Sequence, residues 1–133
     1  MKEKLIELIE NSYSPYSNYK VAAIVVMKDG NEFKGVNVEN ASYGLAICAE
    51  RNAIFNAISN GYKKNDFEKL YVMTCGPKIG MPCFACRQVI VEFFENEKEV
   101  ICMDKEGNQI KHTVLEMCPY PFSDEDLKWN QDL

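Results

Sequence analysis

The sequence predicts an α/β protein of three layers, α-β-α, in which helices cover both faces of a mixed five-stranded sheet. Two observations carry this prediction. Short β-prone runs bounded by turn residues alternate with segments of helical periodicity, in the order α-β-β-α-β-α-β-β-α. The chain of 133 residues also contains no repeat, linker or low-complexity stretch, so we expect a single domain over residues 1–133.

Four segments are predicted to be helices, because their apolar residues recur at helical spacing or their first residues are typical of helix starts. Ser14-Pro15 forms a turn after the first helix, and Gly61 ends the second. Pro82 suits the first turn of the third helix, and Ser123 precedes the acidic residues that favour a helix N-terminus. The expected helices cover residues 2–13, 48–60, 82–95 and a short segment that begins at Ser123.

Five segments are predicted to be strands, because they are rich in β-branched and other apolar residues and lie between turns. Asp29-Gly30 supplies the positive φ values of a hairpin turn between the first two strands. A second turn, over residues 104–108, joins the last two. The expected strands cover residues 19–27, 32–38, 70–74, 99–103 and 109–114.

Composition and charge narrow the function classes. The formal charge of −5 and the lack of a basic stripe predict no nucleic-acid partner. No apolar run approaches the ~18 residues of a membrane span, and the first nine residues mix lysine and glutamate with leucine and isoleucine, unlike a signal peptide. We therefore expect a cytoplasmic protein whose six cysteines do not form a disulfide framework and whose C-x-x-C motif serves metal or redox chemistry.

Two short motifs together predict a catalytic zinc site. Cys83 and Cys86 form a C-x-x-C pair at the start of a predicted helix, a spacing that lets two thiolates bind one tetrahedral ion. Cys48 supplies a third thiolate and leaves the fourth position open for water, as in catalytic zinc sites. Glu50, two residues after this ligand, lies in the first turn of a predicted helix, from which its side chain leans back toward the ion as a general acid–base group.

Other interpretations of the cysteines remain open at this stage. A closed structural zinc site would take its fourth ligand from the remaining cysteines, of which the one at position 102 lies in an apolar strand and is expected to behave as a small hydrophobic residue. A redox C-x-x-C would not explain the Cys48-x-Glu50 motif. The remaining cysteines are Cys75, Cys102 and Cys118.

Two arginines follow the site motifs. Three thiolates on Zn²⁺ carry a net negative charge, which Arg51 and Arg87 are expected to offset by donating hydrogen bonds to the sulfurs. The alternative for each is a surface cation near a helix start.

The chain resembles the cytidine deaminases of the small, homotetrameric type. The resemblance rests on three segments and extends from residue 13 to residue 127, nearly the whole chain. The segments are Asn37-Val38-Glu39-Asn40-Ala41, Cys48-Ala49-Glu50-Arg51 and Pro82-Cys83-x-x-Cys86-Arg87-Gln88-Val89. It implies a cytidine deaminase-like fold, one Zn²⁺ per chain, and hydrolytic deamination of cytidine and 2′-deoxycytidine to uridine and 2′-deoxyuridine, with release of ammonia, in pyrimidine salvage.

The resemblance also implies roles for individual residues. Cys48, Cys83 and Cys86 would bind zinc, Glu50 would transfer protons, and the backbone amide of Ala49 would hold the carbonyl of the base. For the substrate, it implies that Asn37 and Glu39 contact the 3′-hydroxyl of the sugar and that Tyr19 lies beside the base. It also implies a homotetramer in which one subunit completes its neighbour's pocket, with the aromatic residues Tyr43 and Phe122 at the subunit junctions.

Spacing gives independent support to the sugar contacts. Asn37 and Glu39 lie two residues apart at the end of a predicted strand, so their side chains share a face. An amide and a carboxylate there would donate to and accept from one hydroxyl. The alternative is that they cap the turn into the following loop.

The chain departs from the family pattern at Phe84, which stands between two expected ligands where glycine is usual and adds a large ring beside the metal. Three rival functions follow from what the sequence leaves open. They are deamination of a modified cytosine nucleoside such as a nucleoside antibiotic, a catalytically silent zinc-stabilised interaction protein, and polynucleotide editing, which the missing basic funnel disfavours.

Overall fold

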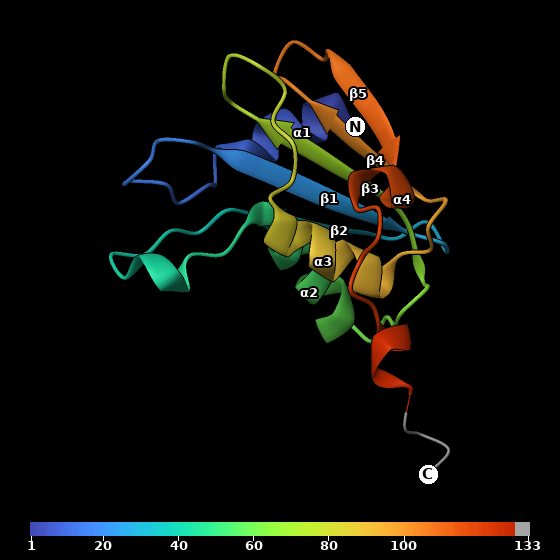
Figure 1. Ribbon diagram of the computed structural model, residues 1–133. Helices are drawn as coiled ribbons and strands as arrows, with labels where there is room; N and C mark the ends of the chain where they lie inside the picture. The colour runs from blue at the N-terminus through green and yellow to red at the C-terminus, as the bar shows by residue number, and fades with distance from the viewer. Residues whose placement is uncertain (130–133) are drawn as a thin grey trace.

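The centre of the molecule is a mixed five-stranded sheet with strand order β2-β1-β3-β4-β5 (Figure 1). The computed structural model describes residues 1–129. Neighbouring strands are antiparallel except for β3 and β4, which are parallel and require the crossover that contains a helix. The strands are β1 (Val21–Met27), β2 (Glu32–Val36), β3 (Phe67–Thr74), β4 (Glu99–Met103) and β5 (Gln109–Thr113).

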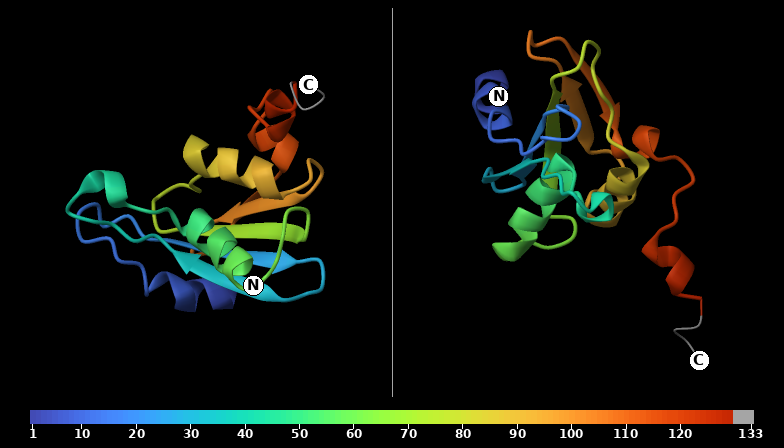
Figure 2. Two further views of the ribbon diagram at one scale, coloured as in Figure 1. Left: turned by 90° about the horizontal axis from the view of Figure 1, so that it is seen from below. Right: turned by 90° about the vertical axis from the view of Figure 1, so that its left-hand side faces the viewer.

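Helices cover both faces of this sheet, as the sequence predicts (Figure 2). α1 (Lys2–Ile9) packs on one face, where Leu5 and Ile9 meet Ile24 and Met73 of the strands. α2 (Ala49–Ser59) and α3 (Phe84–Phe93) lie on the other face over a larger buried cluster. β1 is buried along most of its length because it is an inner strand, between β2 and β3, and is covered on both faces.

Three short elements complete the fold. The 3₁₀ turn η1 (Tyr43–Leu45) lies on a segment that projects from one end of the sheet, as does the loop between α1 and β1 (Figure 1). α4 (Val114–Met117) follows β5 directly, and Thr113 caps it by accepting a hydrogen bond from the Glu116 amide. η2 (Asp124–Leu127) follows Ser123.

The predicted element types are confirmed, with shifted boundaries. The first helix is shorter than expected and ends at Ile9, and β3 begins three residues earlier than expected, at Phe67. The expected last helix forms as the single 3₁₀ turn η2, with Ser123 and Asp126 as its capping box. The short helix α4 was not anticipated.

α2 lies unusually close to β2, and Gly35 makes this approach possible. A Cβ atom at Gly35 would overlap the amide nitrogen of Ala53 and would lie 2.6 Å from the carbonyl oxygen of Ala49. The missing side chain therefore lets the helix backbone rest directly on the strand. This contact fixes the depth of the helix that begins beside Cys48.

Within residues 1–129, no helix has the length and apolar character needed to cross a membrane.

Candidate metal centre and active site

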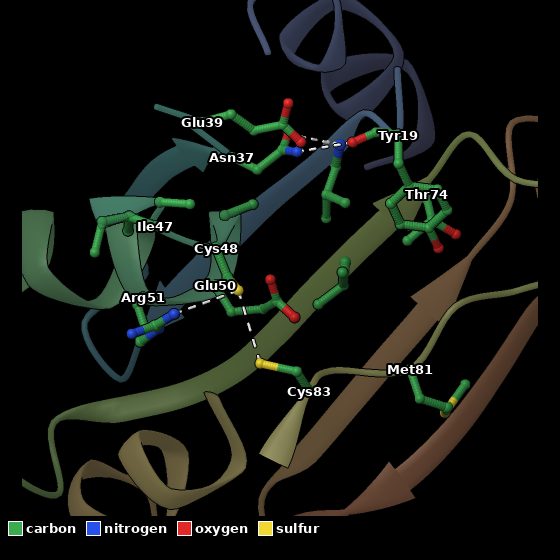
Figure 3. Close-up of a pocket in the computed structure, with 14 residues that line it drawn as sticks. Tyr19, Asn37, Glu39, Ile47, Cys48, Glu50, Arg51, Thr74, Met81 and Cys83 are labelled. Atoms are coloured by element: carbon green, nitrogen blue, oxygen red, sulfur yellow. Dashed lines mark hydrogen bonds between the residues drawn. The ribbon is translucent and has the colours of Figure 1, made fainter. Parts of the chain in front are cut away.

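Three cysteine sulfurs meet where α2 and α3 begin, on the same face of the sheet. Cys48 is the residue before α2, Cys83 is the residue before α3, and Cys86 is buried in the first turn of α3. Their Sγ atoms all lie within 4.8 Å of one another, and the sulfurs of Cys48 and Cys83 are 3.7 Å apart (Figure 3).

This sulfur cluster fits zinc. Sulfurs bound about 2.3 Å from a tetrahedral zinc ion lie about 3.8 Å from one another, close to the Cys48–Cys83 distance. The three cysteines would thus offer Zn²⁺ three thiolate ligands, and two of them, Cys48 and Cys83, line the pocket described below. Within the described residues the remaining cysteines do not belong to this cluster, which disfavours the closed four-cysteine site; they are Cys75, Cys102 and Cys118.

Local backbone contacts hold the ligands in place. Val38 and Ile47 form a bridge through two hydrogen bonds, which leads the chain straight into Cys48. The carbonyl of Cys48 accepts from the Asn52 amide, and that of Cys83 accepts from the Arg87 amide. Both ligands thus stand at helix N-termini, where the partial positive charge favours thiolates.

The electrostatics of the cluster favour negative charge on Cys48. Its pKa is lowered to about 5, chiefly by a hydrogen bond from the Cys86 thiol and then by the guanidinium of Arg51, whose Nη2 donates to the sulfur at 3.4 Å. The pKa of Cys86 is raised in turn, because its thiol keeps the proton that it shares with Cys48. The expected contact between Arg51 and sulfur is therefore present.

Arg87 differs from its expectation. Its Nε donates to the carbonyl of Pro82 at 2.8 Å and its Nη1 to the carbonyl of Met117 at 2.9 Å. These bonds tie the start of α3 to the end of α4, and among the described residues Arg87 donates to these carbonyls rather than to a sulfur of the cluster. The sequence prediction failed here because carbonyl groups brought in by the tertiary fold compete for the same donors.

Phe84 also lies differently from its expectation. Its ring is 74 % exposed, with the Arg87 guanidinium 4.4 Å from the ring centroid. Because Phe84 does not line the pocket beside the metal ligands, its bulk leaves the pocket dimensions unchanged within this chain.

Glu50 has the environment of a proton-transfer group. It is only 4 % exposed, in the first turn of α2, and its carboxyl group points into the pocket (Figure 3). Burial raises its pKa to about 7, and the nearby Cys48 charge acts in the same direction. A carboxyl group with such a pKa can both hold and release a proton near neutrality.

A cavity of about 350 Å³ opens next to the sulfurs and Glu50 (Figure 3). Eight of the predicted site residues line it, and the set combines apolar walls with a few polar groups, as in small-molecule sites. They are Tyr19, Asn37, Glu39, Cys48, Ala49, Glu50, Arg51 and Cys83.

Sequence reasoning missed six lining residues. Thr74 ends β3, and a polar residue at the end of a buried strand was an available signal for it. Met81 lies just before Pro82, and nothing in its local sequence distinguishes it from an ordinary loop residue. The others are Val21, Ala46, Ile47 and Val72.

Asn37 and Glu39 line the cavity, and their polar atoms already have partners in the chain. The Asn37 amide donates to the carbonyl of Tyr19 at 2.7 Å, and its oxygen accepts from the Val21 amide at 2.9 Å. Glu39 accepts from the Tyr16 amide and from the hydroxyl of Ser17, and the latter bond lowers the pKa of Glu39 most. These bonds agree with the turn-capping alternative, and they also hold both side chains at the cavity wall.

The two aromatic residues expected at subunit junctions are exposed. Tyr43 is 78 % exposed on η1 and lines a second cavity of about 290 Å³ between the two projecting segments. Phe122 is 59 % exposed, and its carbonyl accepts from the Gln88 side chain. Neither residue lines the cavity beside Glu50.

The fold and the site together define a class: an α/β protein with a three-cysteine cluster that fits a metal ion and a buried carboxyl group beside it. The family model for the cytidine and deoxycytidylate deaminase zinc-binding region matches residues 1–103. The chain belongs to this family.

Individual relatives support the assignment. A cytidine deaminase of Halalkalibacterium halodurans is 39 % identical over 125 residues, which span 94 % of this chain and 93 % of the relative. A probable cytidine deaminase of Dictyostelium discoideum is 41 % identical over 130 residues, or 94 % of this chain and 86 % of the relative. The crystal structure of a cytidine deaminase from Burkholderia pseudomallei superposes with a TM-score of 0.86 at 40 % identity, covering 90 % of this chain and 94 % of that one.

Proposed function

We propose that this protein is a zinc-dependent cytidine deaminase that converts cytidine and 2′-deoxycytidine to the corresponding uridine nucleosides and ammonia. The observation that carries the proposal is the buried carboxyl group of Glu50 beside the three-sulfur cluster, at the wall of a cavity of nucleoside size. The relatives named above bear the name of the same activity.

Zinc held by Cys48, Cys83 and Cys86 would supply one thing that the side chains lack, a water molecule nucleophilic at neutral pH. Glu50 moves the protons of the attacking water. It takes one proton from this water and gives it to N3 of the cytosine ring as the C4–O bond forms. It then takes the remaining proton from that oxygen and gives it to the amine as the C4–N bond breaks, so that ammonia leaves and the C4 carbonyl of uridine forms. The pKa of about 7 lets one carboxyl group serve both transfers.

The remaining wall residues position the nucleoside. The Ala49 backbone amide holds the base carbonyl, Tyr19 flanks the base, and Asn37 and Glu39 meet the 3′-hydroxyl of the sugar. A carboxylate accepts at about four lone-pair positions, so Glu39 retains capacity for a substrate hydroxyl beside its bonds to residues 16 and 17. The negative charge of Glu39 would repel a 3′-phosphate, which argues against substrates within a polynucleotide.

The proposal includes one zinc ion per chain, a homotetramer in which Tyr43 and Phe122 border a neighbour's pocket, and a role in pyrimidine salvage in the cytoplasm. The exposed positions of the two aromatic rings support the tetramer. The 3.7 Å spacing of the Cys48 and Cys83 sulfurs supports the zinc.

The test combines metal content with ammonia release. Purified protein should hold one zinc ion per chain and release ammonia from cytidine, and a chelator should abolish the release until zinc is restored. Zinc binding without turnover on cytidine, 2′-deoxycytidine or a panel of modified cytosine nucleosides would support the silent interaction protein instead. Turnover of a modified nucleoside but not of cytidine or 2′-deoxycytidine would instead support an enzyme that deaminates modified cytosine nucleosides.

A further inference from the structure

The loop between β3 and α3 carries two glycines against the ring of Tyr19, and no feature of the metal centre accounts for them. A Cβ atom at Gly80 would overlap the phenol oxygen of Tyr19 and would lie 2.9 Å from Thr74 Cγ2. A Cβ atom at Gly76 would lie 3.1 Å from Tyr19 Cε1. The ring of Tyr19 thus occupies space that ordinary side chains at these positions would take.

Backbone conformation does not explain Gly80. The glycines with positive φ are Gly30, Gly61 and Gly107, so the backbone at position 80 is open to any L-residue. The amide of Gly80 donates to Thr74 Oγ1 at 3.0 Å, which holds the loop against the end of β3. Glycine at position 80 therefore leaves room for the Tyr19 side chain and is not required by the backbone conformation.

The ring of Tyr19 lies against Gly76 and Gly80 of this loop, and Tyr19 also lines the cavity. Tyr19 and Thr74 both line the cavity, on the side away from Arg51 (Figure 3). Gly80 contacts both residues and is not among the residues that line the cavity. Because the phenol oxygen is the end of a side chain that rotates, a methyl group at position 80 would displace the ring more readily than the backbone. Because Gly76 and Gly80 lie against the ring, a displaced ring, which is 41 % exposed, would move away from the loop. Tyr19 lines the cavity, so this movement would change the cavity wall.

We propose that Gly80 is a positioning residue for the substrate pocket: it leaves room behind Tyr19, and so sets the place of the aromatic wall and the width of the cavity. Gly76 has a weaker role of the same kind, because its Cβ would meet only a ring carbon at a distance that a small shift relieves. The inference rests on the proposed function for its substrate. The coupling between residues 19 and 80 is a statement about geometry and does not depend on the proposed function.

The test is a double-mutant cycle of Gly80→Ala and Tyr19→Phe. Phenylalanine lacks the oxygen that alanine at position 80 would meet, whereas the Thr74 contact persists in both backgrounds and cancels in the cycle. On zinc-loaded protein we expect Gly80→Ala to raise KM for cytidine about tenfold with kcat within about threefold, because wall placement affects binding more than proton transfer. In the Tyr19→Phe background the same change should raise KM less than about threefold, and Gly76→Ala alone should fall between the two.

Three results would overturn the inference. An equal increase in KM in both backgrounds would show that residues 19 and 80 are not coupled. Loss of zinc from Gly80→Ala would show that the ligand loop moves rather than the ring. Unchanged KM would show that the wall does not depend on Gly80.

Crystal structures of the same variants keep the inference separate from the proposed function. If the wild-type protein does not deaminate cytidine, the proposed function fails, but the position of Tyr19 can still be compared. The ring should shift toward the cavity in Gly80→Ala, whereas in the double variant the phenylalanine ring should keep the wild-type place. A Tyr19 ring in its original place in Gly80→Ala contradicts the inference.

Discussion

Glu50 is the residue whose removal should affect chemistry most and structure least. Glu50→Gln keeps the shape of the side chain but cannot carry the proton, so we expect kcat to fall by about 10³ or more, because one group serves two proton transfers. The measurement is steady-state deamination of cytidine, with zinc content and thermal unfolding as controls. Near-wild-type turnover by a zinc-loaded Glu50→Gln protein would remove Glu50 from the mechanism.

A substitution of Glu39 tests whether the site recognises the 3′-hydroxyl of the sugar. A site that hydrogen-bonds a hydroxyl discriminates against an analogue that lacks it, so 3′-deoxycytidine should lose about 1–3 kcal/mol of transition-state stabilisation relative to cytidine. Glu39→Ala should narrow this difference by slowing cytidine more than the analogue, as measured by kcat/KM for each.

Ser17→Ala is the matched control for Glu39. It removes the hydroxyl that donates to Glu39 and leaves the carboxylate at the cavity. If Ser17→Ala narrows the preference for cytidine as much as Glu39→Ala does, the carboxylate acts by capping the turn, as the alternative interpretation holds. Equal kcat/KM for cytidine and 3′-deoxycytidine in the wild type would also exclude the sugar contact.

At the scale of elements, the decisive contact is between β2 and α2. Gly35→Ala should reduce the free energy of unfolding by about 1–3 kcal/mol or more, because the added methyl group meets helix backbone that has no rotamer to adopt. The displaced helix carries Glu50 and begins next to Cys48, so zinc affinity should fall as well. Denaturant unfolding and zinc titration measure the two effects.

Gly44→Ala is the control for this substitution. A Cβ at Gly44 would meet nothing within 4 Å, and its φ is not positive, so alanine there should change the free energy of unfolding by less than about 1 kcal/mol. Comparable destabilisation by the two alanines would mean that close packing at Gly35 is not what holds α2.

At the scale of the whole molecule, the prediction concerns assembly. Large apolar side chains remain exposed around the projecting segments and beyond α4, and they would be covered in a homotetramer; they are Tyr43, Leu45, Tyr120 and Phe122. We expect sedimentation to show a tetramer, and Phe122→Ala to weaken assembly and raise KM for cytidine together. A fully active monomer at assay concentration would contradict the shared pocket.

Much of the fold and the site could be predicted from the sequence because the signals are local. Helix starts, the hairpin at Asp29-Gly30 and the C-x-x-C spacing each depend on residues a few positions apart. The two ligand-bearing helix starts and the position of Glu50 follow from such patterns. Alternating β-prone and helical segments were likewise enough for the mixed five-stranded sheet.

Only the tertiary structure decided what depends on segments distant in sequence. The fold places the Sγ atom of Cys48 3.7 Å from that of Cys83, which is 35 residues later in the chain. It also gives the Arg87 guanidinium backbone carbonyls as hydrogen-bond acceptors in place of the expected sulfurs. It also turned Phe84 outward and placed the Tyr19 ring in the space left by Gly80. Such contacts depend on which hydrogen-bond donors, acceptors and free space lie next to one another once the helices have packed on the sheet. Because these groups come from segments distant in sequence, no local sequence pattern predicts them.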